Sequence, residues 1–292
     1  MDVLARLLLA AALLAAGPAA AQSQADPATP PDQPDTIRIL LVGNSLTYAN
    51  NLPRLVQAIA TSQPAGPRIE TATYALPGAD LTQLWKDGHA AEALRQGHWD
   101  VLVLQERGGT LECMNTNRQL PECRRSITAH REFTRLAQAQ GTRVLLFMTS
   151  SRVTEMTLND RSARKGHREI LDAAYSRLAR QLAGSGADVR VLPAAAMLLA
   201  PGNGEFDEAP FVDGVHPSVS SSLVIAADLY AAATGREPAP RDLAIDFPLL
   251  PPAAAVRADA PMEVQPQLAG VPTPFLLKAE AVSPLYARAA GD

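Results

Sequence analysis

Short apolar runs alternate with longer amphipathic runs between residues 36 and 235, and this alternation limits the folds open to the chain. The strand-like runs are 37–42, 68–74, 100–104, 143–148 and 188–192. Three of them are almost continuously apolar, which is typical of strands buried on both faces. Helices are predicted over 51–62, 79–95, 126–140, 161–183 and 218–234. Strand–helix units in series predict an α/β fold, a three-layer α/β/α sandwich around a five-stranded parallel sheet.

The first 21 residues have the pattern of a secretory signal peptide. Residues 7–16 read LLLAAALLAA after a start that contains Arg6, and small residues at 19–21 suit cleavage. The apolar run is short for a membrane span, and a buried N-terminal helix is the alternative. Residues 22–35 are polar and Pro-rich, as expected of a linker. We therefore expect a secreted or periplasmic protein that is not stably inserted in a membrane.

The remaining chain divides into a domain over 36–236 and a tail over 237–292, which holds ten of the 24 prolines and shows no strong period. The tail is expected to wrap the domain or to be partly disordered. Formal net charge is −4 and no basic stretch stands out, which argues against a nucleic-acid partner. Neither the oligomeric state nor the tail's function follows from these patterns.

The two cysteines, Cys113 and Cys123, flank a short polar loop. An even number in an oxidising compartment predicts a disulfide between them. Two free thiols or a metal pair are the alternatives, but no nearby Cys or His completes a metal set.

Polar and glycine residues follow each predicted strand, at the edge where open α/β sheets form their sites. The segments are 43–46 (GNSL), 76–80 (LPGAD), 105–109 (QERGG), 149–151 (TSS) and, after the fifth strand, 213–217 (DGVHP). A serine, a histidine and an aspartate are thus expected to converge. A serine hydroxyl needs an imidazole to accept its proton, and the imidazole needs a carboxylate to orient it. Ser45, His216 and Asp213 have these roles in our interpretation, and Gly214 allows the loop to turn.

Gly43-Asn44-Ser45-Leu46, Gly78 and Asp213-x-x-His216, in this chain order, resemble the SGNH (GDSL-type) hydrolase superfamily over about residues 36–235. The resemblance implies a flavodoxin-like sheet, a Ser45 nucleophile with His216 and Asp213, and an oxyanion hole formed by the Ser45 and Gly78 amides and one side-chain amide. We expect no metal and no organic cofactor. A carbohydrate or acetyl ester is the implied substrate.

Two positions depart from the superfamily pattern. Asn44 stands where the usual residue is Asp, which affects the support of the nucleophile turn. The usual Gly-x-Asn-Asp after the third strand is replaced by Leu104-Gln105-Glu106, as in a branch of the superfamily with that segment. Gln105 offers the same amide donor on a longer side chain, so we expect it to be the third oxyanion donor.

Each candidate also has a structural alternative. Ser45 could cap a helix, Asp213 or Gly78 could serve a turn, and Asp207 is a reserve for the acid. Glu106 and Arg107 could form a solvated pair or contact substrate.

The prediction is an exported serine esterase acting on a small-molecule or carbohydrate ester. The rivals are an O-acetyltransferase of the same fold and a catalytically silent glycan-binding module.

Overall fold

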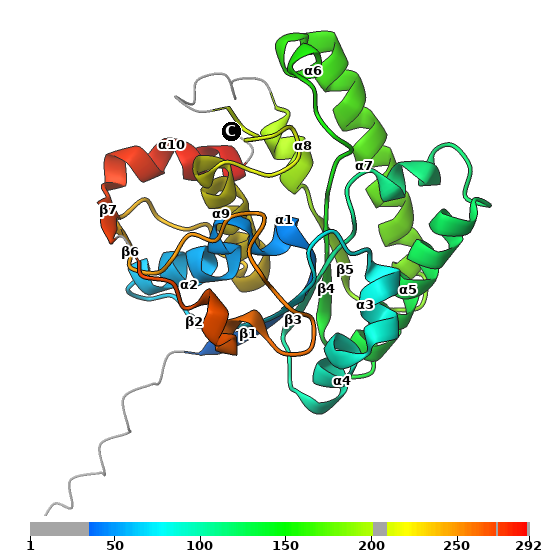
Figure 1. Ribbon diagram of the computed structural model, residues 1–292, viewed down its shortest axis with the longest axis horizontal. Helices are drawn as coiled ribbons and strands as arrows, with labels where there is room; N and C mark the ends of the chain where they lie inside the picture. The colour runs from blue at the N-terminus through cyan, green and yellow to red at the C-terminus, as the bar shows by residue number, and fades with distance from the viewer. Residues whose placement is uncertain (1–34, 201–208, 273, 291–292) are drawn as a thin grey trace, which may run out of the picture. The chain divides into compact units, whose positions relative to one another are not determined.

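Five parallel strands form the central sheet of the computed structural model, which describes residues 35–200, 209–272 and 274–290 (Figure 1). The strands lie in the order β2-β1-β3-β4-β5. Their bounds are Thr36–Gly43 for β1, Arg68–Ala75 for β2, Val101–Gln105 for β3, Arg143–Phe147 for β4 and Val189–Leu192 for β5. All five predicted strands are confirmed to within one residue at each end, as is the three-layer α/β fold.

Helices cover both faces of the sheet (Figure 1). On one face lie α2, Leu52–Ser62, and α9, Val219–Thr234. The other face carries α3, Leu81–Asp87, α4, His89–Gln96, α5, Pro121–Gln138, and α7, Arg161–Ala183. The main core consists of the apolar strand residues and the inner faces of these helices, and residues such as Leu40, Leu102 and Leu145 are fully buried.

The single helix predicted over 79–95 is wrong, because Gly88 divides it into α3 and α4. Gly88 has a φ of +88° and ends α3, since its N–H donates to the carbonyl oxygen of Leu84. A left-handed residue of this kind is a common helix end. Asp80 starts α3 with a capping box that includes Gln83.

Several short elements were not predicted. They are α1, Ser45–Tyr48, with the 3-10 turn η1, Ala49–Asn51; η2, Thr110–Met114; α6, Glu155–Asn159; and α8, Ala194–Leu198. The signal peptide predicted over 1–21 and nearly all of the linker over 22–35 lie outside the described residues. No helix within the described ranges is both long and apolar enough to cross a bilayer.

The described part of the tail packs on the domain as part of the same compact unit. It contains β6, Leu243–Ile245, which pairs antiparallel with β7, Phe275–Leu277. It also contains the 3-10 turns η4, Met262–Val264, and η5, Pro266–Leu268, and a helix, α10, Ala279–Ala289, that packs on α9. Of the two expectations for the tail, wrapping is therefore the one observed over these residues.

Edge strand β2 is covered by a tail side chain. Glu263 accepts hydrogen bonds from the backbone N–H of Thr73 at 2.9 Å and from the hydroxyls of Thr73 and Thr71 at 2.7 and 2.9 Å. An exposed strand edge is a template for pairing with other chains. The tail thus occupies backbone and side-chain donors along that edge.

Candidate active site

The strand order reverses direction at β1, since β2 lies on one side of it and β3 on the other. In open α/β sheets, crevices form at such a switch point, at the carboxyl ends of the strands. Ser45 follows β1 directly and is the first residue of α1, while Gln105 ends β3 beside it. The topology therefore places the candidate nucleophile where the fold forms a site.

Ser45, His216 and Asp213 form one continuous chain of hydrogen bonds. Oγ of Ser45 lies 2.8 Å from Nε2 of His216, and Nδ1 of His216 lies 2.8 Å from Oδ2 of Asp213. The imidazole is largely buried, with 17% of its side chain exposed, whereas the Asp213 side chain is 46% exposed. The structure thus brings together the three residues that the sequence analysis expected to converge.

The loop that carries His216 and Asp213 is held in a tight turn. Oδ1 of Asp213 accepts from the backbone N–H groups of Val215 at 3.0 Å and His216 at 2.8 Å. Gly214 has a φ of +77°, and a side chain there would overlap the carbonyl oxygen of Val153. Both features require glycine, because the φ is left-handed and the backbone contact is close.

The same hydrogen bonds set the charge of Asp213. Partial desolvation raises the pKa of the Asp213 carboxyl, but hydrogen bonds from the His216 backbone and imidazole and from the Val215 backbone outweigh it. The net pKa lies below its ordinary value. Asp213 is therefore ionised at neutral pH, as a partner that orients an imidazole must be.

Two backbone N–H groups, those of Ser45 and Gly78, are candidate donors to an oxyanion. The Ser45 N–H is the first of its helix and lacks an intrahelical acceptor, as helix starts do. Gly78 is exposed, with a φ of +69°. In the described part of the chain, neither N–H has a protein acceptor. The Gly78 loop is tied to the nucleophile turn, since the Leu76 N–H donates to the Gly43 carbonyl at 3.2 Å.

Asn44 supports the nucleophile turn in two directions. Its Oδ1 accepts from the N–H of Leu46 at 3.1 Å, which caps α1. Its Nδ2 donates to the carbonyl oxygen of Ala79 at 2.8 Å, next to Gly78. A carboxylate could make only the first bond, because it has no proton to donate. The departure from Asp therefore adds a link between the two segments that carry the backbone donors.

Gln105 does not point its amide toward the triad, contrary to expectation. The side chain is fully buried, and its Oε1 accepts from the Asn44 N–H at 2.6 Å and from Oγ1 of Thr47 at 2.8 Å. Its Nε2 donates to the carbonyl oxygen of Glu106 at 2.6 Å. These contacts clamp the turn that carries Ser45. A side chain on Gly43 would overlap both Gln105 and Thr47, which explains the glycine there.

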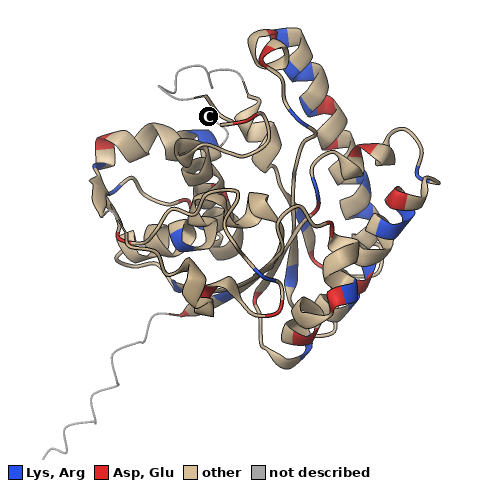
Figure 2. Ribbon diagram, in the orientation of Figure 1, with Lys and Arg blue, Asp and Glu red and all other residues tan. Residues whose placement is uncertain are grey.

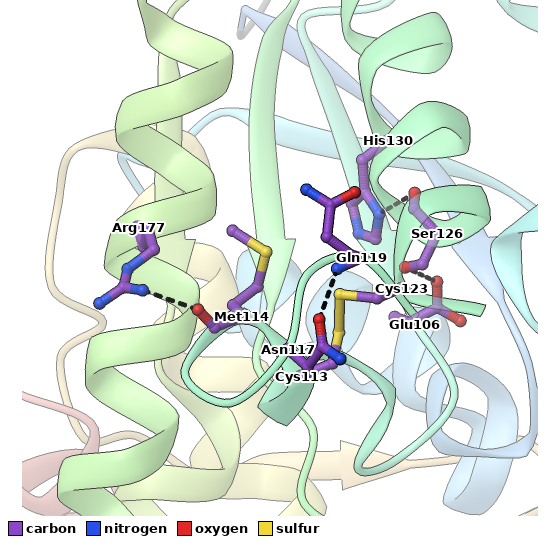
Figure 3. Close-up of a disulfide and its surroundings, with 9 residues drawn as sticks. All are labelled: Glu106, Cys113, Met114, Asn117, Gln119, Cys123, Ser126, His130 and Arg177. Atoms are coloured by element: carbon purple, nitrogen blue, oxygen red, sulfur yellow. Dashed lines mark hydrogen bonds between the residues drawn. A yellow bond between two sulfur atoms is a disulfide. The ribbon is translucent and has the colours of Figure 1, made fainter. Parts of the chain in front are cut away.

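Glu106 is fully buried, so the solvated pair with Arg107 is wrong. Figure 3 shows the Glu106 carboxylate with its partner Ser126. Oε1 of Glu106 accepts from the backbone N–H groups of Leu81 and Arg107, at 3.2 and 2.7 Å, and its Oε2 accepts from Oγ of Ser126 at 2.5 Å. The Ser126 carbonyl contacts Nδ1 of His130 at 2.9 Å. Burial lowers the pKa of His130, although the Glu106 charge opposes this effect. Glu106 thus joins β3 to α3 and α5.

Sequence reasoning missed the segment that follows the nucleophile helix. Asn50 and Asn51 both have left-handed backbones, with φ values of 55° and 57°, and both contact the tail. The Asn50 N–H donates to the Leu250 carbonyl at 2.8 Å, and Nδ2 of Asn51 donates to the Pro248 carbonyl at 2.9 Å. The tyrosine hydroxyl of Tyr48 donates to the Pro252 carbonyl at 2.7 Å. The paired asparagines were the available signal, because Asn tolerates this conformation better than most residues.

A small cavity lies next to Leu46 and the histidine loop, and residues 147–151 at the end of β4 also line it. Its lining includes Leu46, which follows Ser45, and Val215 and Pro217, which flank His216. Leu198, Phe211 and Ile225 add apolar side chains to the lining, which includes neither Ser45 nor His216. Its volume is about 20 Å³, the space of about one water molecule.

The predicted disulfide between Cys113 and Cys123 is confirmed, with Cα atoms 6.0 Å apart (Figure 3). The described residues contain no cluster of three or more His, Cys, Asp or Glu side chains arranged to hold a metal ion. Asp207, the reserve candidate for the acid, lies outside the described residues.

Comparison with known proteins adds support at the level of the fold. No family model matches the chain, and no curated protein matches its sequence. Among solved structures, a DUF4886 family protein from Bacteroides uniformis has a TM-score of 0.50 at 15% identity, covering 69% of this chain and 84% of its own. An acetyl xylan esterase, AlAXEase, has a TM-score of 0.49 at 16% identity, covering 67% of this chain and 99% of its own. LAE5, an alpha/beta hydrolase enzyme from the metagenome of Lake Arreo in Spain, has a TM-score of 0.45 at 15% identity, covering 70% and 97%.

Proposed function

We propose that the protein is an exported serine esterase that hydrolyses carboxylic ester bonds through an acyl-enzyme. The observation that carries the proposal is the unbroken hydrogen-bond chain from Oγ of Ser45 through His216 to Asp213. Each link has the length that proton transfer and imidazole orientation require. Its position at the switch point of the sheet supports the same assignment.

In the proposed first step, Oγ of Ser45 attacks the ester carbonyl carbon while Nε2 of His216 accepts the hydroxyl proton. The carbonyl oxygen becomes an oxyanion, and in the proposal the Ser45 and Gly78 N–H groups stabilise it. Collapse of the intermediate breaks the ester C–O bond, and His216 returns the proton to the departing alcohol. Water then attacks the acyl-enzyme with His216 again as base, which releases the acid and regenerates Ser45.

The proposal gives Gln105 a different role from the third oxyanion donor that the sequence predicted. Because both polar atoms of the Gln105 amide have protein partners, we propose that its role is to hold the nucleophile turn. The oxyanion hole that we propose therefore consists of two backbone N–H groups.

For the acyl group we propose acetyl, which the superfamily resemblance implies. For the alcohol part we propose a carbohydrate, following the superfamily resemblance. The Cys113–Cys123 disulfide supports the proposed export, because such bonds persist in oxidising compartments.

The test compares p-nitrophenyl acetate with p-nitrophenyl butyrate and octanoate, using wild type, Ser45→Ala and the control Ser162→Ala. Ser162 is exposed on α7, so Ser162→Ala removes the same hydroxyl group as Ser45→Ala but at a position outside the candidate site. We expect acetate to be the preferred ester and Ser45→Ala to abolish turnover with an unchanged melting temperature. A fluorophosphonate probe should label wild type and the control and spare Ser45→Ala.

Turnover by Ser45→Ala near the wild-type rate would remove Ser45 as nucleophile. The two rival functions predict other results. An acetyltransferase would place the acetyl group on an acceptor glycan in preference to water. A silent binding module would neither turn over ester nor react with the probe.

A further inference from the structure

A groove of about 500 Å³ lies on the surface between α3 and α5, apart from the triad. The residues that line it combine one aromatic side chain, three cations and several small polar groups: Thr82, Trp85, Lys86, Arg124, Arg125 and Thr128 carry its chemistry. No Asp or Glu lines it. The groove is therefore locally cationic on a chain whose formal net charge is −4.

The three cations have no competing partner among the residues that the structure describes. Within the described ranges, the charged groups of Lys86, Arg124 and Arg125 form no ion pair or hydrogen bond, whereas Arg131 and Arg135 further along α5 both contact Glu132. Arg124 and Arg125 are exposed on the first turns of α5 (Figure 2 marks Lys and Arg positions on both helices). Guanidinium groups that are free in this way are suited to bidentate contact with carboxylates.

Trp85 gives the groove a fixed apolar wall. The indole is half-buried and its ring lies 5.0 Å from the ring of Phe133 in an edge-on arrangement, which holds it in place. An aromatic wall with a few convergent polar groups is typical of small-molecule sites of this volume. The apolar face of a sugar ring matches the indole, while a carboxylate on that ring matches the neighbouring cations.

The groove begins at the edge of the sheet that carries Ser45. α3 starts at Leu81, three residues after Gly78, and its first residue is fixed by the buried Glu106 carboxylate. Trp85 lies about one helical turn further along. α5 also starts at this edge, since it returns the chain from the end of β3 to the start of β4. The Cys113–Cys123 disulfide anchors its first turn immediately before Arg124 (Figure 3).

We propose that this groove binds a carboxylate-bearing sugar chain, such as a run of uronic acid residues. The inference rests on the proposed function in one respect: an acetyl group elsewhere on the same chain would be presented to Ser45. The substrate class would then be an acetylated acidic glycan, with Trp85 against a sugar face and Arg124 and Arg125 on the carboxylates.

The experiment measures binding of pentagalacturonate and of the neutral xylopentaose by calorimetry, using the full protein. We expect pentagalacturonate to bind at least about tenfold more tightly and to weaken as salt is added. Arg124→Gln/Arg125→Gln and, separately, Trp85→Ala should each weaken pentagalacturonate binding by about tenfold or more. Arg131→Gln/Arg135→Gln removes the same charge from the same helix outside the groove and should bind as wild type does.

Melting temperatures of all variants separate lost binding from lost folding. Equal affinity for the two pentasaccharides would overturn the proposal, as would equal losses in the groove and control variants. Tighter binding of a single-stranded oligonucleotide than of pentagalacturonate would assign the groove to another polymer. Pentagalacturonate carries no acetyl ester, so its binding does not depend on Ser45. A protein that failed to hydrolyse esters could thus still bind pentagalacturonate, and a protein that failed to bind pentagalacturonate could still hydrolyse esters.

Discussion

Nδ2 of Asn50 donates a hydrogen bond to the carbonyl oxygen of Pro217 at 2.9 Å, which joins the nucleophile segment to the residue that follows His216. The same amide contacts Oγ of Ser222 in α9 at 2.9 Å. Asn50 adopts a left-handed backbone to make these contacts, a conformation that costs free energy and persists where the surroundings impose it. We infer that Asn50 is a positioning residue, which sets the separation between Ser45 and His216.

The first prediction concerns Asn50→Asp, which keeps the size and the tolerance of the left-handed backbone but cannot donate to Pro217. Because a small displacement of His216 weakens proton transfer, we expect kcat for p-nitrophenyl acetate to fall by about 10–100-fold, with a smaller change in KM. Asn50→Gly should lower kcat similarly while relieving the backbone strain, so its melting temperature should exceed that of Asn50→Asp. Wild-type kcat in both variants would show that this link does not position the triad.

The second prediction separates two roles of Gln105. Gln105→Ala leaves the buried Asn44 N–H without its acceptor and opens a cavity, so we expect a loss of about 2–4 kcal/mol in the free energy of unfolding. Urea unfolding gives that quantity, and kcat is measured at a temperature where the variant remains folded. Unchanged stability together with a 100–1000-fold drop in kcat, about the effect of losing one donor, would restore Gln105 to the oxyanion hole.

The fate of Gln105 illustrates where sequence reasoning about the site ends. Ser45, Asp213 and His216 could be identified because a strand end, a chain order and a three-residue spacing each constrain them. The position of Gln105 at the end of β3 was also correct. The direction of its amide was not predictable, because it depends on the Asn44 N–H and Thr47 hydroxyl, which approach only after β1 and β3 pair.

The fold shows the same division between local and distant causes. Strands β1, β3 and β4 were predictable because burial on both faces requires nearly continuous apolar runs. Helix α7 was predicted with its observed bounds of Arg161–Ala183. Gly88 was overlooked as a helix end since one glycine inside a periodic pattern is often tolerated. The structure of the tail could not be predicted from its own sequence, because the tail is held by contacts with Tyr48, Asn50 and strand β2, which are far away in the sequence.

The third prediction tests how the tail stabilises the sheet. Glu263→Ala removes the acceptor for the Thr73 N–H and for the hydroxyls of Thr71 and Thr73 at the edge of β2. We expect the free energy of unfolding to fall by about 1–2 kcal/mol, because hydrogen bonds to a charged group are lost at a partly exposed site. Glu280→Ala, on α10 and also exposed, serves as the control and should change stability by less than about 0.5 kcal/mol. Equal losses in both variants would show that the edge contact contributes nothing specific.

The last prediction concerns Asp228, a carboxyl on α9 that the proposed mechanism does not use. Its Oδ2 is buried and has no hydrogen-bond partner among the described residues. Burial raises the pKa of Asp228 from its ordinary value of 3.8 to about 7, and the nearby Glu237 charge acts in the same direction. The folded protein therefore holds a proton on Asp228 at pH values where the unfolded chain has released it.

This difference in the pKa of Asp228 fixes the sign of its effect on stability. Below pH 3.8 both states are protonated, and between 3.8 and about 7 only the folded state is, so the free energy of unfolding falls as pH rises through that window. Above about pH 7 the free energy of unfolding has fallen by its full amount, up to about 4 kcal/mol, since each unit of pKa difference corresponds to about 1.4 kcal/mol. Asp228→Asn keeps the side chain neutral and should remove this decline.

Urea unfolding at about pH 4 and about pH 8 should show Asp228→Asn gaining stability over wild type only at the higher pH. Asp172→Asn, an exposed carboxyl on α7, is the matched control and should follow wild type at both. A gain of the same size at both pH values would mean that the amide improves packing and that Asp228 does not titrate in this range.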